Sequence, residues 1–181
     1  MPETTAAAAA MPTLHGERVT IRPPHPGELD ALALEMTTDP EASVWWSNDV
    51  ETIRRWFTED PSYIVLVIEE AGRAGGIIAY DEEMDPDYHS VGVDIALLQC
   101  CVNRGLGPEA LRLLIGWLVA ERDHHRVTID PALANARAIH AYEKVGFRRI
   151  GVARDYERGP DGTWHDNLLM DLLAREFTPA G

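Results

Sequence analysis

Residues 91–122 read VGVDIALLQCCVNRGLGPEALRLLIGWLVAER, and the periodicity changes part-way along this stretch. Apolar residues first alternate, which predicts a β-strand with one apolar face: Val91, Val93, Ile95 and Leu97. They then recur three and four positions apart, which predicts an amphipathic helix: Ala110, Leu111, Leu114, Ile115, Leu118 and Val119. We therefore expect the fold to be built around a strand that leads through a short turn into a helix.

The turn between the two patterns is Arg104-Gly105-Leu106-Gly107, followed by Pro108. Proline is tolerated in the first helical turn, because its missing N–H has no partner within the helix there. Glycines let the backbone approach a ligand closely, and the helix dipole favours negative charge, so the turn is a candidate anion site. A tight turn without a ligand is the alternative. The residues match neither of the two standard nucleotide-binding signatures, since no Lys-Ser/Thr pair and no third glycine follow.

The length of 181 residues suits one domain with a substantial core. We expect a single domain over residues 13–181 and a disordered leader over residues 1–12. No run approaches the length of a membrane span, and the beginning lacks the regions of a signal peptide. The only cysteines, Cys100 and Cys101, are adjacent, which disfavours a structural disulfide and fits a reducing cytoplasm.

The formal net charge of −14 argues against nucleic acid and anionic membranes as partners. It is compatible with a cationic substrate, although a plain solvated acidic surface is the simpler explanation. Five acids are concentrated in the stretch from Asp81 to Asp87. Such a stretch is usually a solvated loop, but beside a cleft it would concentrate cations.

The remaining pattern predicts further strands at 18–22, 63–68, 76–80, 126–130, 147–152 and 164–172, with helices at 27–37, 49–58 and 136–145. Asn135 is expected to cap the last helix and Gly146 to end it. Trp45 and Trp46 fall in an expected loop, where either one lines a cleft or both pack in the core. The order predicts an α/β protein with a mixed sheet of about seven strands and helices on both faces.

Two stretches resemble one family. Val102-Asn-Arg-Gly-Leu-Gly107 resembles the acetyl-coenzyme A pyrophosphate loop of the GNAT superfamily of N-acetyltransferases, although Val102 stands where many members have Arg or Gln. Asn135-Ala-Arg-Ala-Ile-His-Ala-Tyr-Glu-Lys-Val-Gly-Phe147 is similar to a later helix and strand of that superfamily. The resemblance implies the GNAT fold, whose central sheet is mostly antiparallel, and acetyl-CoA as co-substrate without a metal.

Within the superfamily the chain looks most like the aminoglycoside 6'-N-acetyltransferases. The likeness is carried by Val44-Trp45-Trp46, Val93-Asp94 and Thr128-Ile-Asp130-Pro131. It implies transfer of acetyl from acetyl-CoA to the 6'-amino group of a polycationic aminoglycoside, which confers resistance. The alternatives are acetylation of a ribosomal-protein N-terminus or a siderophore hydroxylysine, and a non-catalytic acyl-CoA-binding module. Native substrate, regiochemistry and the choice between monomer and homodimer stay open.

The resemblance also implies roles for single residues. The coenzyme would contact Leu97, Leu98, Val102, Asn103, Arg104, Gly105, Leu106, Gly107, Asn135 and Tyr142. Asp94 would orient and deprotonate the amine and Tyr142 would protonate the leaving thiolate, with a structural salt bridge and core packing as their respective alternatives. The aminoglycoside would contact Trp46, Glu82, Asp85, Asp94 and Asp130. Cys100 and Cys101 are expected only to pack in the loop, because an amine can attack the thioester directly.

Overall fold

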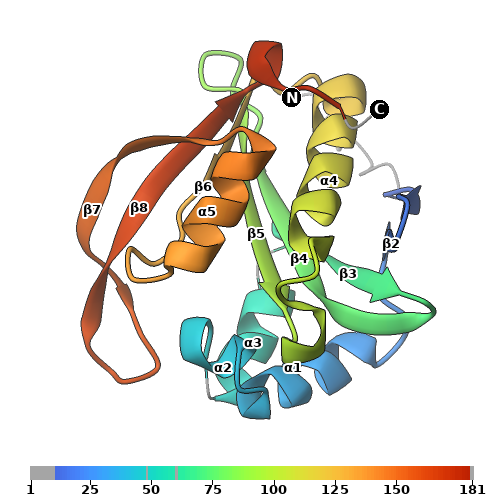
Figure 1. Cartoon of the computed structure of the whole chain (residues 1–181), viewed down its shortest axis with the longest axis vertical. Helices are drawn as coiled ribbons and strands as arrows, with labels where there is room; N and C mark the ends of the chain where they lie inside the picture. Colours follow the sequence, from blue (N-terminus) through green and yellow to red (C-terminus); the bar gives the residue numbers. More distant parts are fainter. Residues whose placement is uncertain (1–10, 48, 60, 180–181) are drawn as a thin grey trace, which may run out of the picture.

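The strand β5, Ser90–Leu97, lies inside an eight-stranded sheet in the computed structural model, which describes residues 11–47, 49–59 and 61–179 (Figure 1). The strand order is β1-β2-β3-β4-β5-β6-β8-β7. The other strands are β1 Leu14–His15, β2 Val19–Arg22, β3 Ile64–Glu70, β4 Arg73–Glu83, β6 Arg126–Ile129, β7 Arg148–Arg158 and β8 Trp164–Leu173. Neighbouring strands are antiparallel except β5 and β6, which run parallel.

Helices cover both faces of this sheet, as the sequence predicts (Figure 1). On one face α4, Leu106–Arg122, and α5, Ala136–Val145, pack against alternate strand residues such as Val93. On the other face α1, Glu28–Thr38, and α3, Val50–Thr58, pack against the opposite set, which includes Val67. Short 3-10 turns follow β5 at Gln99–Cys101 and β8 at Ala174–Glu176. The mixed, mostly antiparallel α/β architecture is therefore confirmed.

The sheet has one strand more than expected, because β1 has two residues and is too short to show an alternating pattern. Residues 44 and 45, expected in a loop, end the short helix α2, Ala42–Trp45. A single helical turn has too few residues for a periodic signal. Side-chain contacts hold it instead: the Asp39 carboxylate accepts the N–H groups of Glu41 and Ala42, each at 2.9 Å.

The expected ends of α5 are confirmed. The Asn135 side chain accepts the N–H of Ala138 at 3.1 Å, and Gly146 adopts the left-handed conformation with φ 119°. Pro108 lies in the first turn of α4, where its missing N–H costs no helical hydrogen bond. Of the expected leader, residues 1–10 lie outside the described residues, and Met11 packs against the core.

The strands β5 and β6 part soon after they meet. They pair only at Val91 with Val127 and at Gly92 with Thr128, whereas β5 continues to Leu97. Beyond Gly92, the edge of β5 that faces α5 therefore has no neighbouring strand among the described residues. Within the same described ranges, no helix is long and apolar enough to cross a membrane.

Candidate active site

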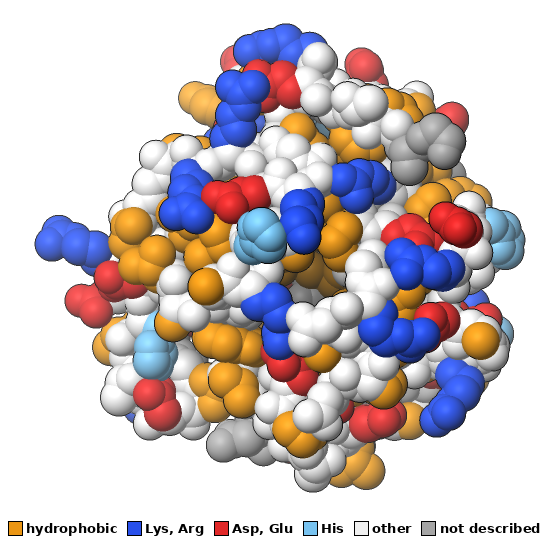
Figure 2. Space-filling view, viewed as in Figure 1, with side chains coloured by type: hydrophobic (Ala, Val, Ile, Leu, Met, Phe, Trp, Pro, Cys, Tyr) orange, Lys and Arg blue, Asp and Glu red, His pale blue; other side chains and the backbone are white. Residues whose placement is uncertain are grey.

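A cleft of about 1010 Å³ opens where β5 and β6 part. Its walls come from α2, α3, the end of β5, the start of α4 and the length of α5. Figure 2 shows the hollow near the middle of this face, with hydrophobic side chains at its floor and charged side chains around its mouth. The parting of two strands thus produces both the space and an unpaired backbone edge beside it.

The cleft has two halves, and the first of them lies over the turn that leads into α4. Asn103 and Gly105 both adopt the left-handed conformation, with φ 59° and 78°, and so bend the chain sharply before the helix begins. A Cβ at Gly107 would lie 3.3 Å from the Leu97 side chain, so glycine allows the helix start to approach β5 closely. The N–H groups of the first helical turn have no helical partner and suit an anion.

Basic side chains flank this half. Arg137, His140 and Lys144 line the cleft from α5. Lys144 and the α4 N-terminus add positive charge to this half, whereas the charge of Arg137 is paired with Glu41. The half therefore suits a ligand that carries phosphate groups.

The other half is acidic. Asp81 from β4, Asp94 from β5, Asp130 just after β6 and Glu157 from β7 all line the cleft. Burial and the neighbouring acids Asp130, Asp81 and Glu157 raise the pKa of Asp94 from 3.8 to about 6. Burial likewise raises the pKa of Asp130 and of Glu157. Several carboxylates held this close are stabilised by bound cations, so this half suits a multiply charged amine.

Asp94 accepts a hydrogen bond in this half from the Tyr63 hydroxyl, which lies 2.9 Å from its Oδ2. Burial and the charge of Asp94 raise the pKa of Tyr63 well above its usual range, so this tyrosine remains a donor. The hydrogen bond fixes one carboxylate oxygen. This contact is a hydrogen bond to a neutral hydroxyl and not the structural salt bridge that the sequence left open.

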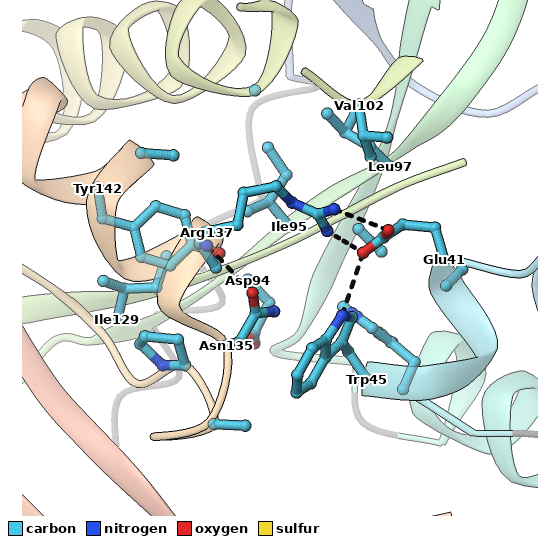
Figure 3. A pocket seen from close by; sticks show the side chains of 18 of the residues that line it. Glu41, Trp45, Asp94, Ile95, Leu97, Val102, Ile129, Asn135, Arg137 and Tyr142 are labelled. Carbon is cyan, nitrogen blue, oxygen red and sulfur yellow. Dashed lines mark hydrogen bonds and ion pairs between the residues drawn. The ribbon is translucent and has the colours of Figure 1, made fainter. Parts of the chain in front are cut away.

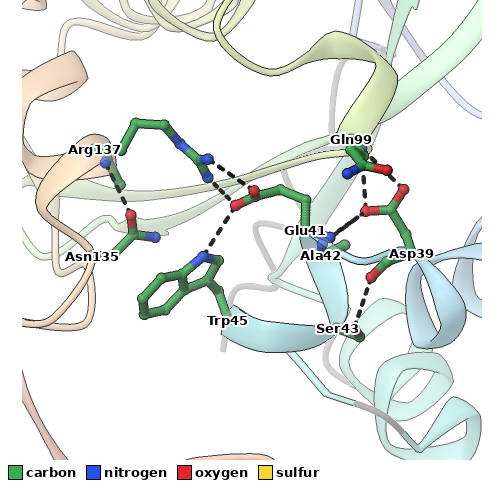
Figure 4. A network of polar contacts seen from close by, with 9 residues as sticks. Asp39, Glu41, Ala42, Ser43, Trp45, Gln99, Asn135 and Arg137 are labelled. Atoms are coloured by element: carbon green, nitrogen blue, oxygen red, sulfur yellow. Dashed lines mark hydrogen bonds and ion pairs between the residues drawn. The ribbon is translucent and has the colours of Figure 1, made fainter.

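Two charged residues meet across the cleft between its halves. The Arg137 guanidinium from α5 donates to the Glu41 carboxylate, at 2.8 Å for Nη1 and Oε2 (Figure 3). The Trp45 indole N–H donates to the same carboxylate at 3.1 Å. Asp39, beside Glu41, accepts the N–H of Gln99 at 3.0 Å and so ties α2 to the end of β5 (Figure 4). We call the Glu41–Arg137 pair the cleft bridge.

Most of the residues expected to contact ligands line this cleft. On the coenzyme side these are Leu97, Val102, Asn103, Gly105, Leu106, Gly107, Asn135 and Tyr142, and on the acceptor side Trp46, Asp94 and Asp130. Leu98 is buried in the core on the α1–α3 face instead. The Arg104 side chain pairs with Glu70 on β3, at 2.6 Å for Nη2 and Oε1, outside the cleft lining.

The structure does not bring Glu82 and Asp85 to the cleft. Glu82 accepts hydrogen bonds from Arg122 at 2.9 Å and lies 2.7 Å from the buried His124 ring, on the α4 face of the sheet. Asp85 lies in an exposed turn, where it accepts the N–H of Asp87 at 2.9 Å. Because side chains alternate along a strand, Asp81 points to the opposite face from Glu82 and enters the cleft.

Tyr142 is buried on α5, yet it lines the cleft and packs beside Phe147, with ring centroids 6.2 Å apart. Burial first, and then the charges of Asp94 and Asp130, raise the pKa of Tyr142 above its usual range. Its hydroxyl therefore stays protonated at neutral pH. Core packing and proton donation are compatible roles for this side chain.

Sequence reasoning missed several cleft residues: Glu41, Tyr63, Asp81, Arg137 and Glu157. Most of them are separated in the sequence from the motifs that carry the resemblance, and only their tertiary convergence gives them a role. For Asp81 the deciding feature is its partner in the sheet: it pairs with Gly92, whose missing side chain leaves room for the Asp81 carboxylate, and only the folded sheet shows this pairing.

The acetyltransferase (GNAT) domain family matches residues 18–148 of the chain. The chain belongs to the GNAT acetyltransferase family. As a member of this family, it is an acetyl-CoA-dependent N-acetyltransferase.

Curated relatives share a shorter part of the acetyltransferase chain. A kanamycin resistance protein of Rhizobium radiobacter is 34% identical over 84 residues, which are 46% of this chain and 72% of the relative. An aminoglycoside N(6')-acetyltransferase type 1 of Klebsiella pneumoniae is also 34% identical over 84 residues, but these are only 39% of that protein. A ribosomal-protein alanine N-acetyltransferase of Escherichia coli is 26% identical over 104 residues, 58% of this chain and 53% of the relative.

Solved structures share the fold over most of the acetyltransferase chain. Mycobacterium smegmatis RimJ in complex with CoA-disulfide has a TM-score of 0.77 at 20% identity and covers 91% of this chain and 88% of its own. Spermidine N-acetyltransferase from Vibrio cholerae in complex with CoA and spermine has a TM-score of 0.73 at 17% identity, with coverages of 89% and 98%. At these identities the likeness concerns the fold.

Proposed function

We propose that this acetyltransferase transfers the acetyl group of acetyl-CoA to a primary amine of an aminoglycoside, at its 6'-amino group. The observation that carries the proposal is the division of the cleft by charge. The half over the α4 N-terminus is lined by basic side chains of α5, and the half around Asp94 is lined with carboxylates. An anionic coenzyme and a polycationic acceptor each match one half.

The coenzyme would lie along the first half. Its pyrophosphate would accept from the N–H groups at the start of α4, with the basic α5 residues nearby. Its extended arm would lie along the edge of β5 that β6 leaves unpaired, as an added strand does. A backbone N–H of that edge would polarise the thioester carbonyl.

The acceptor would enter through the acidic half. Asp81, Asp130 and Glu157 would pair with its ammonium groups, and Trp45, held by Glu41, would provide an aromatic wall for a sugar ring. These contacts would place one amine beside Asp94. The curated relatives that act on aminoglycosides, and the neighbour solved with spermine, support an acceptor with several amines.

The reaction then needs two proton movements. The neutral amine nitrogen attacks the carbonyl carbon, and Asp94 accepts the amine proton directly or through one water. The carbon–sulfur bond breaks, the sulfur leaves as thiolate, and Tyr142 supplies the proton that makes it a thiol. A tyrosine with a raised pKa is a weak acid, so its part is to donate as the thiolate forms.

A ribosomal-protein N-terminus is the second candidate acceptor, because the Escherichia coli relative acts on an alanine of a ribosomal protein. Such an acceptor presents one reactive amine on a peptide. It would bring a single cation to a half of the cleft that holds several carboxylates. The charge of the cleft therefore favours the aminoglycoside.

The experiment measures release of CoA thiol with kanamycin, tobramycin, spermine and a peptide that begins with alanine. We expect turnover with the aminoglycosides, with a kcat/KM at least about a hundredfold above that of the peptide. A hundredfold corresponds to about 2.8 kcal/mol, which the additional ammonium–carboxylate pairs would supply. Preference for the peptide, or no thiol release with any aminoglycoside, would exclude the proposed acceptor.

A further inference from the structure

The only two cysteines of the chain, Cys100 and Cys101, lie side by side just ahead of the loop Val102–Gly107. They belong to the 3-10 turn that follows β5, and their Sγ atoms are 3.5 Å apart. Cys100 is exposed, whereas Cys101 is buried with 5% of its surface accessible and lines the cleft. The proposed transfer reaction uses neither thiol.

A direct disulfide between the two is disfavoured by geometry. Neighbouring Cα atoms are about 3.8 Å apart, below the usual separation in disulfides of roughly 4.4 to 6.8 Å. The two sulfurs would also have to approach to about 2.05 Å, which adjacent residues reach only with strain. A third atom placed between the sulfurs avoids this approach, because each sulfur then bonds to the bridging atom and not to the other sulfur.

The turn has little room to rearrange. A Cβ at Gly75 would lie 2.5 Å from the Sγ of Cys101, so this sulfur packs directly against the backbone of β4. The N–H of Cys101 donates to the carbonyl of Leu98 at 2.8 Å, and Arg104 donates to the carbonyl of Cys100 at 3.3 Å. We therefore expect an atom bound to both sulfurs to press on β4 and to shift the backbone that carries Val102 and Asn103.

We propose that Cys100 and Cys101 form a dithiol site for a trivalent thiophilic metalloid of the arsenite class, and that an occupied site opposes coenzyme binding at the adjacent loop. Sulfur ligands are soft and select soft, thiophilic ions. The exposed Cys100 captures the metalloid first, and Cys101 closes the chelate from the cleft side. In the chemistry of an arsenoxide, two S–H bonds and one As–O double bond give two As–S bonds and one water, with no change of oxidation state.

The test uses phenylarsine oxide on the full chain, followed by intact mass and by titration with acetyl-CoA. We expect one adduct per chain with loss of one water, reversal by 2,3-dimercaptopropanol, and an acetyl-CoA affinity lowered about tenfold, within the range usual for coupled sites. Saturating acetyl-CoA should slow formation of the adduct, because the two ligands compete for one arrangement of the loop.

Three comparisons make the result decisive. Cys100→Ser and Cys101→Ser should each lose the stable adduct while their melting temperatures stay near that of the parent. Blocking the exposed Cys100 with iodoacetamide should have the same effect on the unmutated chain, which removes any dependence on a variant that folds poorly. Three results would overturn the proposal. Either variant could form the adduct to the same extent as the parent, the parent could form none, or the adduct could leave the affinity for acetyl-CoA unchanged.

The adduct mass is read without any acetyl acceptor. Failure of the aminoglycoside assay therefore leaves this test unaffected, and failure of the dithiol site leaves the proposed function unaffected.

Discussion

At the scale of single residues, the proposed chemistry centres on Asp94. It is a carboxylate on a strand, held by the Tyr63 hydroxyl and surrounded by other acids, and burial and these acids raise its pKa to about 6. A base with this pKa is ionised at neutral pH and still binds a proton more strongly than an ordinary aspartate does. The same environment disfavours its charge in the empty enzyme, so function and stability oppose each other at this position.

Asp94→Asn should lower kcat at least about a hundredfold, since the amide keeps the shape but cannot accept a proton, and general bases usually contribute about 10²- to 10⁴-fold. Steady-state thiol release against acetyl-CoA and kanamycin measures this. Asp130→Asn is the matched control, with an expected increase in acceptor KM and a smaller change in kcat. A parental kcat in the Asp94→Asn variant would remove the role of base from this residue.

The pH dependence of folding stability follows from the upward shift of the Asp94 pKa. A carboxyl whose pKa rises from 3.8 to about 6 on folding contributes its stabilisation below the unfolded value, and loses it as pH rises through the folded value. Between about pH 4 and pH 6 the parent should therefore lose stability relative to Asp94→Asn. Melting temperatures of the two proteins across this range check it, and parallel curves would contradict it. The acidic limb of kcat/KM should fall near pH 6.

At the scale of elements, the site depends on how α2 and α5 are held on opposite sides of the cleft. The cleft bridge joins them, and Asp39 fixes the start of α2 against the end of β5. Neither connection is a backbone hydrogen bond of regular secondary structure. The relative position of the two walls therefore rests on a few side chains, which makes these positions sensitive to substitution.

Two substitutions of Glu41 distinguish its ion pair with Arg137 from its hydrogen bond to Trp45. Glu41→Gln removes the charge of the ion pair but keeps an oxygen for the indole N–H, whereas Glu41→Ala removes both. Because exposed ion pairs contribute about 0.2–1 kcal/mol, the Gln variant should change acceptor KM by less than about fivefold. The Ala variant should raise it further, with kcat nearly unchanged. Equal KM values for both variants would mean that the aromatic wall does not depend on Glu41.

Asn135 combines a cap with a proposed coenzyme contact, and two variants distinguish these roles. Asn135→Asp retains a capping oxygen but loses the amide N–H₂ donor, whereas Asn135→Ala loses both. The Ala variant should be destabilised by about 1 kcal/mol and the Asp variant much less. If the amide binds the coenzyme arm, both variants should raise the KM for acetyl-CoA. A parental KM in the Asp variant would leave capping as the function of Asn135.

At the scale of the whole molecule, the net charge of −14 and the acidic half of the cleft act in the same direction. Both attract a polycation from a distance. The basic flank of α5 offsets this field locally, where the anionic coenzyme would lie. The cleft thus presents basic side chains to the anionic coenzyme and carboxylates to the proposed cationic acceptor.

The acidic half of the cleft predicts that kcat/KM for a polycationic acceptor depends on salt concentration. The kcat/KM for kanamycin should fall steeply as ionic strength rises, because the Debye length shortens from about 30 Å at 0.01 M to roughly 8 Å at 0.15 M. The kcat/KM for a monoamine acceptor should change much less. Measurement of both acceptors in the same salt series, at saturating acetyl-CoA, provides the comparison. If kcat/KM fell equally steeply with ionic strength for both acceptors, the charge of the cleft would have no part in acceptor binding.

The sequence predicted those parts of the fold that repeat a periodic pattern. The strand–turn–helix around β5 and both ends of α5 are examples, because periodicity and caps are local properties. The site was only partly predictable. Asp81 and Glu82 differ by one position, and the apolar run before them gives no sign of which face is open. Glu82 was favoured, whereas the fold turns Asp81 into the cleft.

The separation of charge within the cleft also affects how a catalytic cycle would end. Acetylation converts the bound ammonium into an amide, and a neutral amide has no ion pair to make with Asp94. The product therefore lacks the charge that the substrate presented to Asp94, at the moment when this carboxylate has just accepted a proton, and only its remaining ammonium groups still pair with the cleft acids. If the acceptor is an aminoglycoside as proposed, its acetylated product should bind more weakly than the substrate and inhibit the enzyme less than a competing substrate does.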